Sequence, residues 1–340
     1  MSLRLTHEVL EVETRYPFTI TRGSRSTYRL VWVRLADADG LEGWGEADPS
    51  SFYGESAESV VAALGRLGPL LADADPFQLE RTEAALLGAL RHNAAARVAV
   101  SAALHDLVGK RLGVPLWKLW GLDPAAAPAS SFTIGMAEPA TIRQKVREAA
   151  EYPILKVKVG TGDDEATLLA VRQETDKPIR VDANCGWTLK QALRRLPLLR
   201  EMGVELIEQP LAPENVEGLA AVRRASDIPV IADESCRTAE DIPRLVGAVD
   251  GINIKLAKCG SLREALRMIA VARAHHLQVM VGCMIETSLG ITAAAHFAPL
   301  LDYVDLDGAA LLKRDPFAGA TIAGGRVTLP SGPGLGVTRR

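Results

Sequence analysis

The fold is decided by five short apolar runs: ILKVK (154–158), IRVD (179–182), ELIE (205–208), PVIAD (229–233) and INIK (252–255). Their last residues lie 24, 26, 25 and 22 positions apart, and they are Lys158, Asp182, Glu208, Asp233 and Lys255. One strand, one helix and two short loops take about this many residues, and eight such units close a parallel barrel. Because the carboxyl ends of barrel strands meet at one face, we expect these side chains to share one pocket.

The rhythm of the runs extends over most of the chain. Helical patterns lie between most of the strand candidates and are clearest at 163–175, 188–203 and 261–276. This order predicts a modified TIM barrel of the (β/α)7β type over residues 119–315. The expected strands are 130–136, 154–159, 179–184, 205–209, 229–233, 251–256, 278–283 and 303–307.

The N-terminal part follows a different pattern, which predicts an α+β capping domain over residues 1–118. Alternating residues up to position 60 indicate antiparallel strands, with DADG as a hairpin turn, and 56–113 reads as helices. The tail, 316–340, contains a Gly-Gly hairpin signal, and we expect it to pair back with the N-terminal sheet and complete the capping domain.

Composition excludes several classes of protein. The 340 residues are 48% hydrophobic and 24% charged, with a net charge of −3, so no basic surface for nucleic acid or membrane phosphates is expected. No apolar stretch is long enough to span a membrane, and the N-terminus lacks a signal-peptide core. We therefore expect a cytoplasmic protein, whose four cysteines are reduced thiols rather than metal ligands.

Asp182, Glu208 and Asp233 end three successive strands and form a candidate metal site. Crowded carboxylates raise one another's pKa unless a cation neutralises them. Hard oxygen ligands of this kind suit Mg²⁺, and no histidine lies at a matching position to favour zinc. A surface acidic residue at a strand end is common, but three at equal spacing favour the metal site.

Lysines flank this candidate site. Lys156 and Lys158 point to the same side of their strand, and Lys255 lies across the barrel. Near Mg²⁺ and other ammonium groups a lysine is expected to have a lowered pKa and to act as a general base. Two bases on opposite sides of a metal-bound carboxylate predict proton removal next to that carboxylate and return on the other face, hence racemisation or epimerisation. The alternative for Lys156 and Lys158 is a solvated edge strand.

The motifs together resemble the enolase superfamily, muconate lactonizing subgroup, over nearly the whole chain. They are KVK (156–158), VDAN (181–184), IEQP (207–210), ADES (232–235) and NIKLAKCGS (253–261). The resemblance implies one Mg²⁺ per subunit held by the three carboxylates. It also implies Lys158 and Lys255 as acid/base catalysts, with Lys156 stabilising negative charge.

A DLD motif on the last strand resembles that of the dipeptide epimerases within this subgroup. There the two aspartates, here Asp305 and Asp307, hold the α-ammonium of the substrate. The alternative is that one of them faces inward and pairs with a neighbouring lysine. RGSRS (22–26) resembles a loop of the L-Ala-D/L-Glu type, which implies that Arg25 binds the glutamate side chain. Its alternative is an ordinary surface arginine.

The remaining assignments concern the pocket walls and the surroundings of the metal. Tyr53 in the second capping loop, Glu286 after the seventh strand and Thr133 on the first are expected to contact the substrate. Asn184 and Glu234 are expected to support the ligands, and Lys258 to pair with a carboxylate. The other arginines, together with His275 and His276, are interpreted as solvated surface.

The expected function is Mg²⁺-dependent epimerisation of dipeptides at the C-terminal residue, with L-Ala-D/L-Glu from murein peptides as the leading substrate. One rival is a cycloisomerase or o-succinylbenzoate synthase on the same scaffold, which has no need of an ammonium grip. A second rival is a catalytically silent barrel that binds metal and peptide. Such barrels often form homo-oligomers, but no interface can be read from the sequence.

Overall fold

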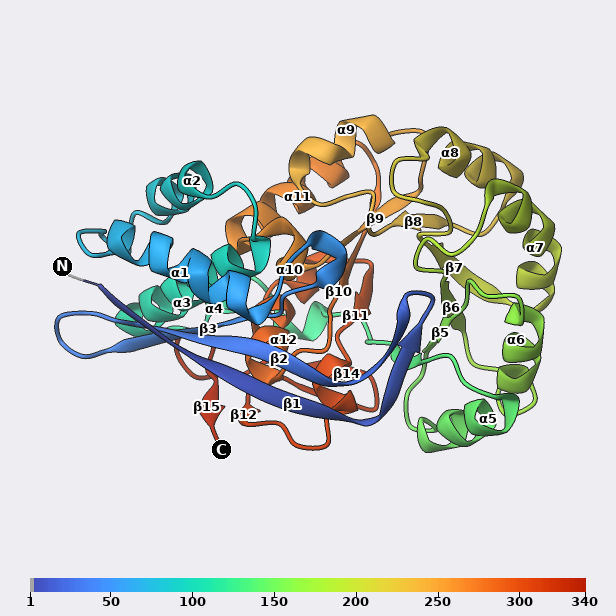
Figure 1. Cartoon of the computed structure of the whole chain (residues 1–340), viewed down its shortest axis with the longest axis horizontal. Helices are drawn as coiled ribbons and strands as arrows, with labels where there is room; N and C mark the ends of the chain where they lie inside the picture. Colours follow the sequence, from blue (N-terminus) through green and yellow to red (C-terminus); the bar gives the residue numbers. More distant parts are fainter. Residues whose placement is uncertain (1–2) are drawn as a thin grey trace.

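The computed structural model describes residues 3–340, and its N-terminal sheet is a long, bent hairpin extended by one strand (Figure 1). Strands β1 (Arg4–Ile20), β2 (Gly23–Ala36) and β3 (Glu42–Ala47) pair antiparallel in that order. The DADG turn joins β2 to β3, as predicted. The far end of the β1–β2 hairpin reaches over the barrel, so this sheet carries a loop to the site.

Three helices cover the sheet: α1 (Ala57–Leu71), α2 (Leu79–Ala89) and α3 (Ala94–Leu112). Ser56 caps α1 by accepting a hydrogen bond from the Ser59 N–H, and Gly113 ends α3 with a φ of 69°. Helix α3 is buried along most of its length because Gly45 on β3 lets the helix backbone approach closely. These contacts give the capping domain its own apolar core.

Eight parallel strands form the barrel in sequence order, and each lies within the expected range apart from a one-residue extension at Val204. The barrel closes where the Ser131 N–H donates to the Val304 carbonyl at 3.1 Å. Most strand residues are fully buried, as expected for a sheet covered by helices. The strands are β4 (Phe132–Ile134), β5 (Leu155–Lys158), β6 (Ile179–Asp182), β7 (Val204–Glu208), β8 (Val230–Ala232), β9 (Gly251–Ile254), β10 (Gln278–Gly282) and β11 (Tyr303–Asp305).

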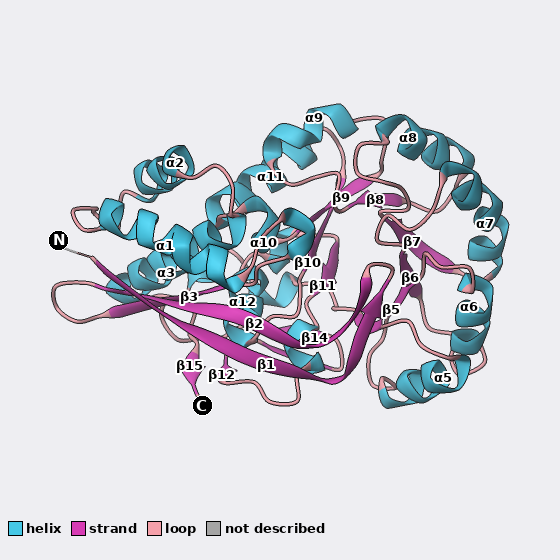
Figure 2. Cartoon of the chain, in the orientation of Figure 1, coloured by secondary structure: helices cyan, strands magenta, loops and turns pink. Residues whose placement is uncertain are grey.

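Helices follow all the barrel strands but the last, which confirms the (β/α)7β pattern (Figure 2). The outer helices are α5 (Pro139–Glu148), α6 (Asp164–Arg172), α7 (Leu189–Glu201), α8 (Val216–Ala225), α9 (Ile242–Leu245), α11 (Leu262–Ala274) and α12 (Ser288–Ala295). Helix α4 (Leu116–Leu119) lies before the barrel and α10 (Leu256–Cys259) follows β9; like α9, each is a single turn. Within residues 3–340, every helix is too short or too polar to cross a membrane.

The tail differs from the expectation. Its Gly-Gly hairpin forms between β13 (Thr321–Ala323) and β14 (Arg326–Thr328), but the tail adds no strand to the β1–β3 sheet among the described residues. Instead β12 (Phe317–Ala318) pairs with β15 (Thr338–Arg339). The tail still joins the capping domain, because Leu335 donates its backbone N–H to Asp106 on α3 at 2.7 Å. The domain limits at 118 and 316 stay predictions.

Candidate active site

Three acidic side chains meet at the carboxyl ends of neighbouring strands. Asp182 and Glu208 are the last residues of β6 and β7, and Asp233 follows β8 directly. All three are almost fully buried, and one oxygen of each lies within 4.8 Å of the others. The sequence therefore predicted this cluster correctly.

Lys156 lies at the centre of the cluster. Its Nζ is 2.7 Å from Glu208 Oε2, 3.1 Å from Asp182 Oδ2 and 2.8 Å from Asp305 Oδ2. The side chain is 1% exposed, which rules out the solvated edge strand. Its burial is tolerated because three carboxylates surround the ammonium group.

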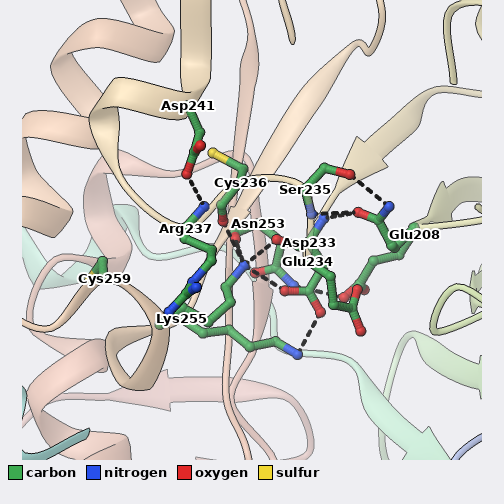
Figure 3. Close-up of polar contacts among 12 residues, drawn as sticks. Glu208, Asp233, Glu234, Ser235, Cys236, Arg237, Asp241, Asn253, Lys255 and Cys259 are labelled. Atoms are coloured by element: carbon green, nitrogen blue, oxygen red, sulfur yellow. Dashed lines mark hydrogen bonds and ion pairs between the residues drawn. The ribbon is translucent and has the colours of Figure 1, made fainter. Parts of the chain in front are cut away.

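The other two lysines approach from opposite sides. Lys158 Nζ lies 2.7 Å from Asp182 Oδ2. Lys255 Nζ lies 2.8 Å from Asp233 Oδ2 (Figure 3). Strands β5 and β9 are the second and sixth of eight in the ring, so they lie across the barrel from each other. Lys158 and Lys255 both line one pocket of about 280 Å³.

The charges of the cluster shift the pKa values of its members. Burial acts to lower the pKa of Lys255, but the charge of Asp233 outweighs it and holds that pKa above its ordinary value. At Lys255 the charge of Asp233 therefore outweighs the lowering of the pKa that was expected. Burial, reinforced by the charge of Asp182, raises the pKa of Glu208 to about 7.

The donor set fits a hard divalent cation. Glu208 Oε2 and Asp233 Oδ1 are buried without a hydrogen bond of good geometry, although ammonium groups lie near both. Oxygen ligands that lack directed donors are available to a metal ion. The four cysteines are free thiols, and none belongs to the cluster.

Supporting side chains hold each ligand. Asn184 donates to Asp182 Oδ2 at 3.2 Å, and Lys258 Nζ lies 2.6 Å from Asp233 Oδ1, as predicted. Asn253, which the sequence analysis missed, donates to Glu208 Oε1 at 2.8 Å. Its place in the NIK motif, two residues before Lys255, was the available signal.

Asp305 and Asp307 both line the pocket, and Lys156 links Asp305 to the acidic cluster. Asp305 accepts hydrogen bonds from Ser131 Oγ at 2.7 Å and from Lys156. The alternative, in which an aspartate faces inward and pairs with a neighbouring lysine, therefore holds for Asp305. Asp307 Oδ2 accepts the backbone N–H of Thr133 at 2.6 Å. Burial and the charge of Asp305 raise the pKa of Asp307 to about 7.

The capping loops form the roof of the pocket. Arg25 lines it and donates to Ser51 Oγ at 3.1 Å. Phe52, rather than the expected Tyr53, is the aromatic residue that this loop contributes to the pocket, because the short turn at 51–53 directs the Tyr53 ring toward Arg237. Glu286 lies outside the pocket, where it accepts the Met284 N–H at 2.9 Å and faces the capping domain.

Arg22 was interpreted as solvated surface, and this was wrong. Its Nη1 donates to Glu234 Oε1 at 2.9 Å and to the Asn184 carbonyl at 3.2 Å, and the ring of Phe52 covers the guanidinium. The tip of the β1–β2 hairpin is therefore tied to the barrel beside the acidic cluster. Glu234, predicted to support the ligands, is the barrel partner of this contact.

Comparison with known proteins agrees with this geometry. Residues 4–121 match the mandelate racemase/muconate lactonizing enzyme N-terminal domain, and residues 140–340 match the enolase C-terminal domain-like family. An L-Ala-D/L-Glu epimerase from Bacteroides thetaiotaomicron is 42% identical, with 99% of this chain and 88% of that protein covered. A hydrophobic dipeptide epimerase from Enterococcus faecalis is 33% identical, with 99% and 100% covered.

Solved structures show the same similarity. The dipeptide epimerase from Enterococcus faecalis, in complex with Mg and L-Leu-L-Tyr, has a TM-score of 0.95 at 32% identity, covering 99% of this chain and 100% of that one. A substrate-liganded L-Ala-D/L-Glu epimerase from Bacillus subtilis also has a TM-score of 0.95 at 32% identity, covering 99% and 98%. This chain belongs to the mandelate racemase/muconate lactonizing enzyme family of the enolase superfamily, and within it to the dipeptide epimerases.

Proposed function

We propose that this protein epimerises dipeptides at the α-carbon of the C-terminal residue, with L-Ala-D/L-Glu as the leading substrate. One observation carries the proposal: Lys158 and Lys255 face one pocket from opposite strands, beside an acidic cluster. Two opposed bases are needed to remove a proton from one face of a carbon and return one to the other. A binding protein without catalysis has no use for this arrangement.

The acidic cluster supplies the cofactor site. Asp182, Glu208 and Asp233 would hold one Mg²⁺ per subunit, as the metal-bound relatives suggest. Bound there, Mg²⁺ would offset the charge of these carboxylates and the negative charge that develops on the substrate carboxylate.

The lysines move the proton. One of Lys158 and Lys255, in its neutral form, accepts the α-proton, and the other, as an ammonium, donates a proton to the opposite face. The α-carbon is inverted, and the two lysines have exchanged protonation states. Lys156 keeps its positive charge among its carboxylate neighbours and stabilises the negative charge electrostatically.

Charged side chains that line the pocket orient the dipeptide. Asp305 and Asp307 receive the α-ammonium of the substrate. Asp307 is more available to accept its hydrogen bonds, because Asp305 is already paired with Lys156. A bound ammonium favours the ionised form of Asp307. Arg25, placed in the roof, receives the glutamate side-chain carboxylate through its guanidinium.

The test is proton NMR of L-Ala-L-Glu incubated in D₂O with the protein and Mg²⁺. Loss of the glutamate α-proton signal, together with new peaks of the second diastereomer, is the expected result. Inactivity on a library of L,L-dipeptides would refute the proposal, and turnover of a non-amine diacid by an Asp307→Ala variant would favour a cycloisomerase. We also propose that the protein is cytoplasmic and that it assembles as a homo-oligomer. Gel filtration measures the oligomeric state.

A further inference from the structure

A second cavity adjoins the reaction pocket. It has a volume of about 240 Å³, close to the 280 Å³ of the pocket itself. Phe18, Thr133 and Leu311 line both spaces, so these three side chains are the partition between them. The reaction described above uses nothing on the far side of this partition.

The partition lies beside the ammonium grip. Thr133, one of its members, donates its backbone N–H to Asp307 at 2.6 Å. Tyr152 lines the second cavity, and its phenol is close enough to Asp307 that the carboxylate, after burial, contributes to raising its pKa to about 12. The second cavity therefore begins where the amino end of a bound dipeptide would be held.

An ammonium at Asp307 fixes the α-carbon of the N-terminal residue about 1.5 Å from that nitrogen. The peptide bond leaves this carbon toward the acidic cluster, so the side chain must leave in another direction. We propose that the second cavity is the subsite for the side chain of the N-terminal residue, and that it prefers apolar side chains larger than that of alanine. This inference rests on the proposed dipeptide epimerisation, and it replaces the alanine of the leading substrate with a larger apolar residue.

The chemistry of the walls sets the preference. The rings of Phe132 and Tyr152 pack with their centroids 4.6 Å apart and form an apolar floor with Phe18. Two of the polar groups at the rim are already engaged, since the hydroxyl of Tyr16 donates to Glu148 at 3.0 Å and Arg15 donates to the Leu312 carbonyl at 3.1 Å; Lys145 and Glu151 also line the cavity. Burying an added apolar group there is favourable, whereas an alanine methyl leaves most of the space unfilled.

The experiment measures kcat/KM for L-Ala-L-Glu, L-Leu-L-Glu and L-Phe-L-Glu with the Mg²⁺-loaded protein. The L-Leu and L-Phe substrates are expected to exceed L-Ala by about tenfold or more, mainly through a lower KM. The same ratios are measured in Ala310→Phe, which enlarges a residue that lines both the second cavity and a neighbouring surface cavity. Thr321→Phe is the control, because its exposed residue lines only that surface cavity. The ratio of kcat/KM for the L-Leu and L-Phe substrates to that for L-Ala-L-Glu is expected to fall sharply in Ala310→Phe and to stay unchanged in Thr321→Phe.

Each other outcome decides against the subsite in its own way. If L-Ala-L-Glu is turned over but larger N-terminal residues give no gain, the cavity does not receive the side chain while the proposed function stands. If the preference survives in Ala310→Phe, the side chain binds elsewhere. If no dipeptide exchanges its α-proton, the proposed function fails and the subsite fails with it.

Discussion

Asn253 offers a way to separate support of the metal ligand from support of the fold. Its side-chain N–H donates to Glu208 Oε1 at 2.8 Å, and the asparagine is fully buried. An Asn253→Leu variant removes this donor without changing the charge of the site. Supporting residues of this kind typically contribute about 10- to 100-fold to metal affinity, and we expect a loss of that size.

The expected change in stability is small because two effects oppose each other. Losing a hydrogen bond to a charged group costs about 1.5–3 kcal/mol. However, Asn253 Oδ1 is itself buried without a partner, and removing an unsatisfied acceptor recovers about 1–3 kcal/mol. The free energy of unfolding is therefore expected to change by only about 1 kcal/mol.

The assay is calorimetric titration of Mg²⁺ into each variant, with urea unfolding of the metal-free protein. Gln278→Leu is the matched control, since it also removes an amide whose oxygen is buried without a partner, at the opposite end of the neighbouring strand. The control should keep its Mg²⁺ affinity. An Asn253→Leu variant that is stable and binds Mg²⁺ as tightly as the parent would refute the supporting role.

Three further predictions test other parts of the molecule. Burial lowers the pKa of His296 from 6.5 to about 4, although its Nε2 bonds the Leu335 carbonyl. The unfolded chain therefore takes up the proton first, and about 3 kcal/mol of folding stability should be lost as the pH falls from 6.5 to 4. Urea unfolding of the protein and of His296→Gln at these pH values measures the loss. Gly45→Ala should lower the melting temperature or prevent folding, because a Cβ there collides with the Ala99 carbonyl of α3; calorimetry checks this. Arg25→Ala should reduce kcat/KM for L-Ala-L-Glu by about tenfold or more but leave L-Ala-L-Leu unaffected, and an equal loss on both would contradict the assignment.

The barrel and the acidic cluster could be predicted because each depends on a local rule. A strand followed by a helix repeats at nearly constant length, and the residue at each strand end faces the same side of the barrel. Asp182, Glu208, Asp233 and the paired lysines all follow from that rule. They needed no knowledge of how distant segments pack.

The loops and the tail could not be predicted in the same way. Whether Phe52 or Tyr53 faces the pocket depends on a single turn of the loop, and Arg22 finds its partner Glu234 only after the capping hairpin docks on the barrel. The tail carries strand-like patterns that are equally compatible with pairing to the N-terminal sheet or to itself. The contact of Leu335 with Asp106 on α3, which fixes its path, is invisible in the local sequence.

Transfer of the proton between two opposed lysines is tested most directly by where deuterium appears in the earliest product. L-Ala-L-Glu is incubated in D₂O with the Mg²⁺-loaded protein, and the first few per cent of L-Ala-D-Glu is isolated and analysed by NMR. Two bases on opposite faces predict that this product carries deuterium at the glutamate α-carbon from the first turnover, while the remaining substrate still carries its proton. Early product that retains the original proton would show that a single base serves both faces and would contradict the roles given to Lys158 and Lys255.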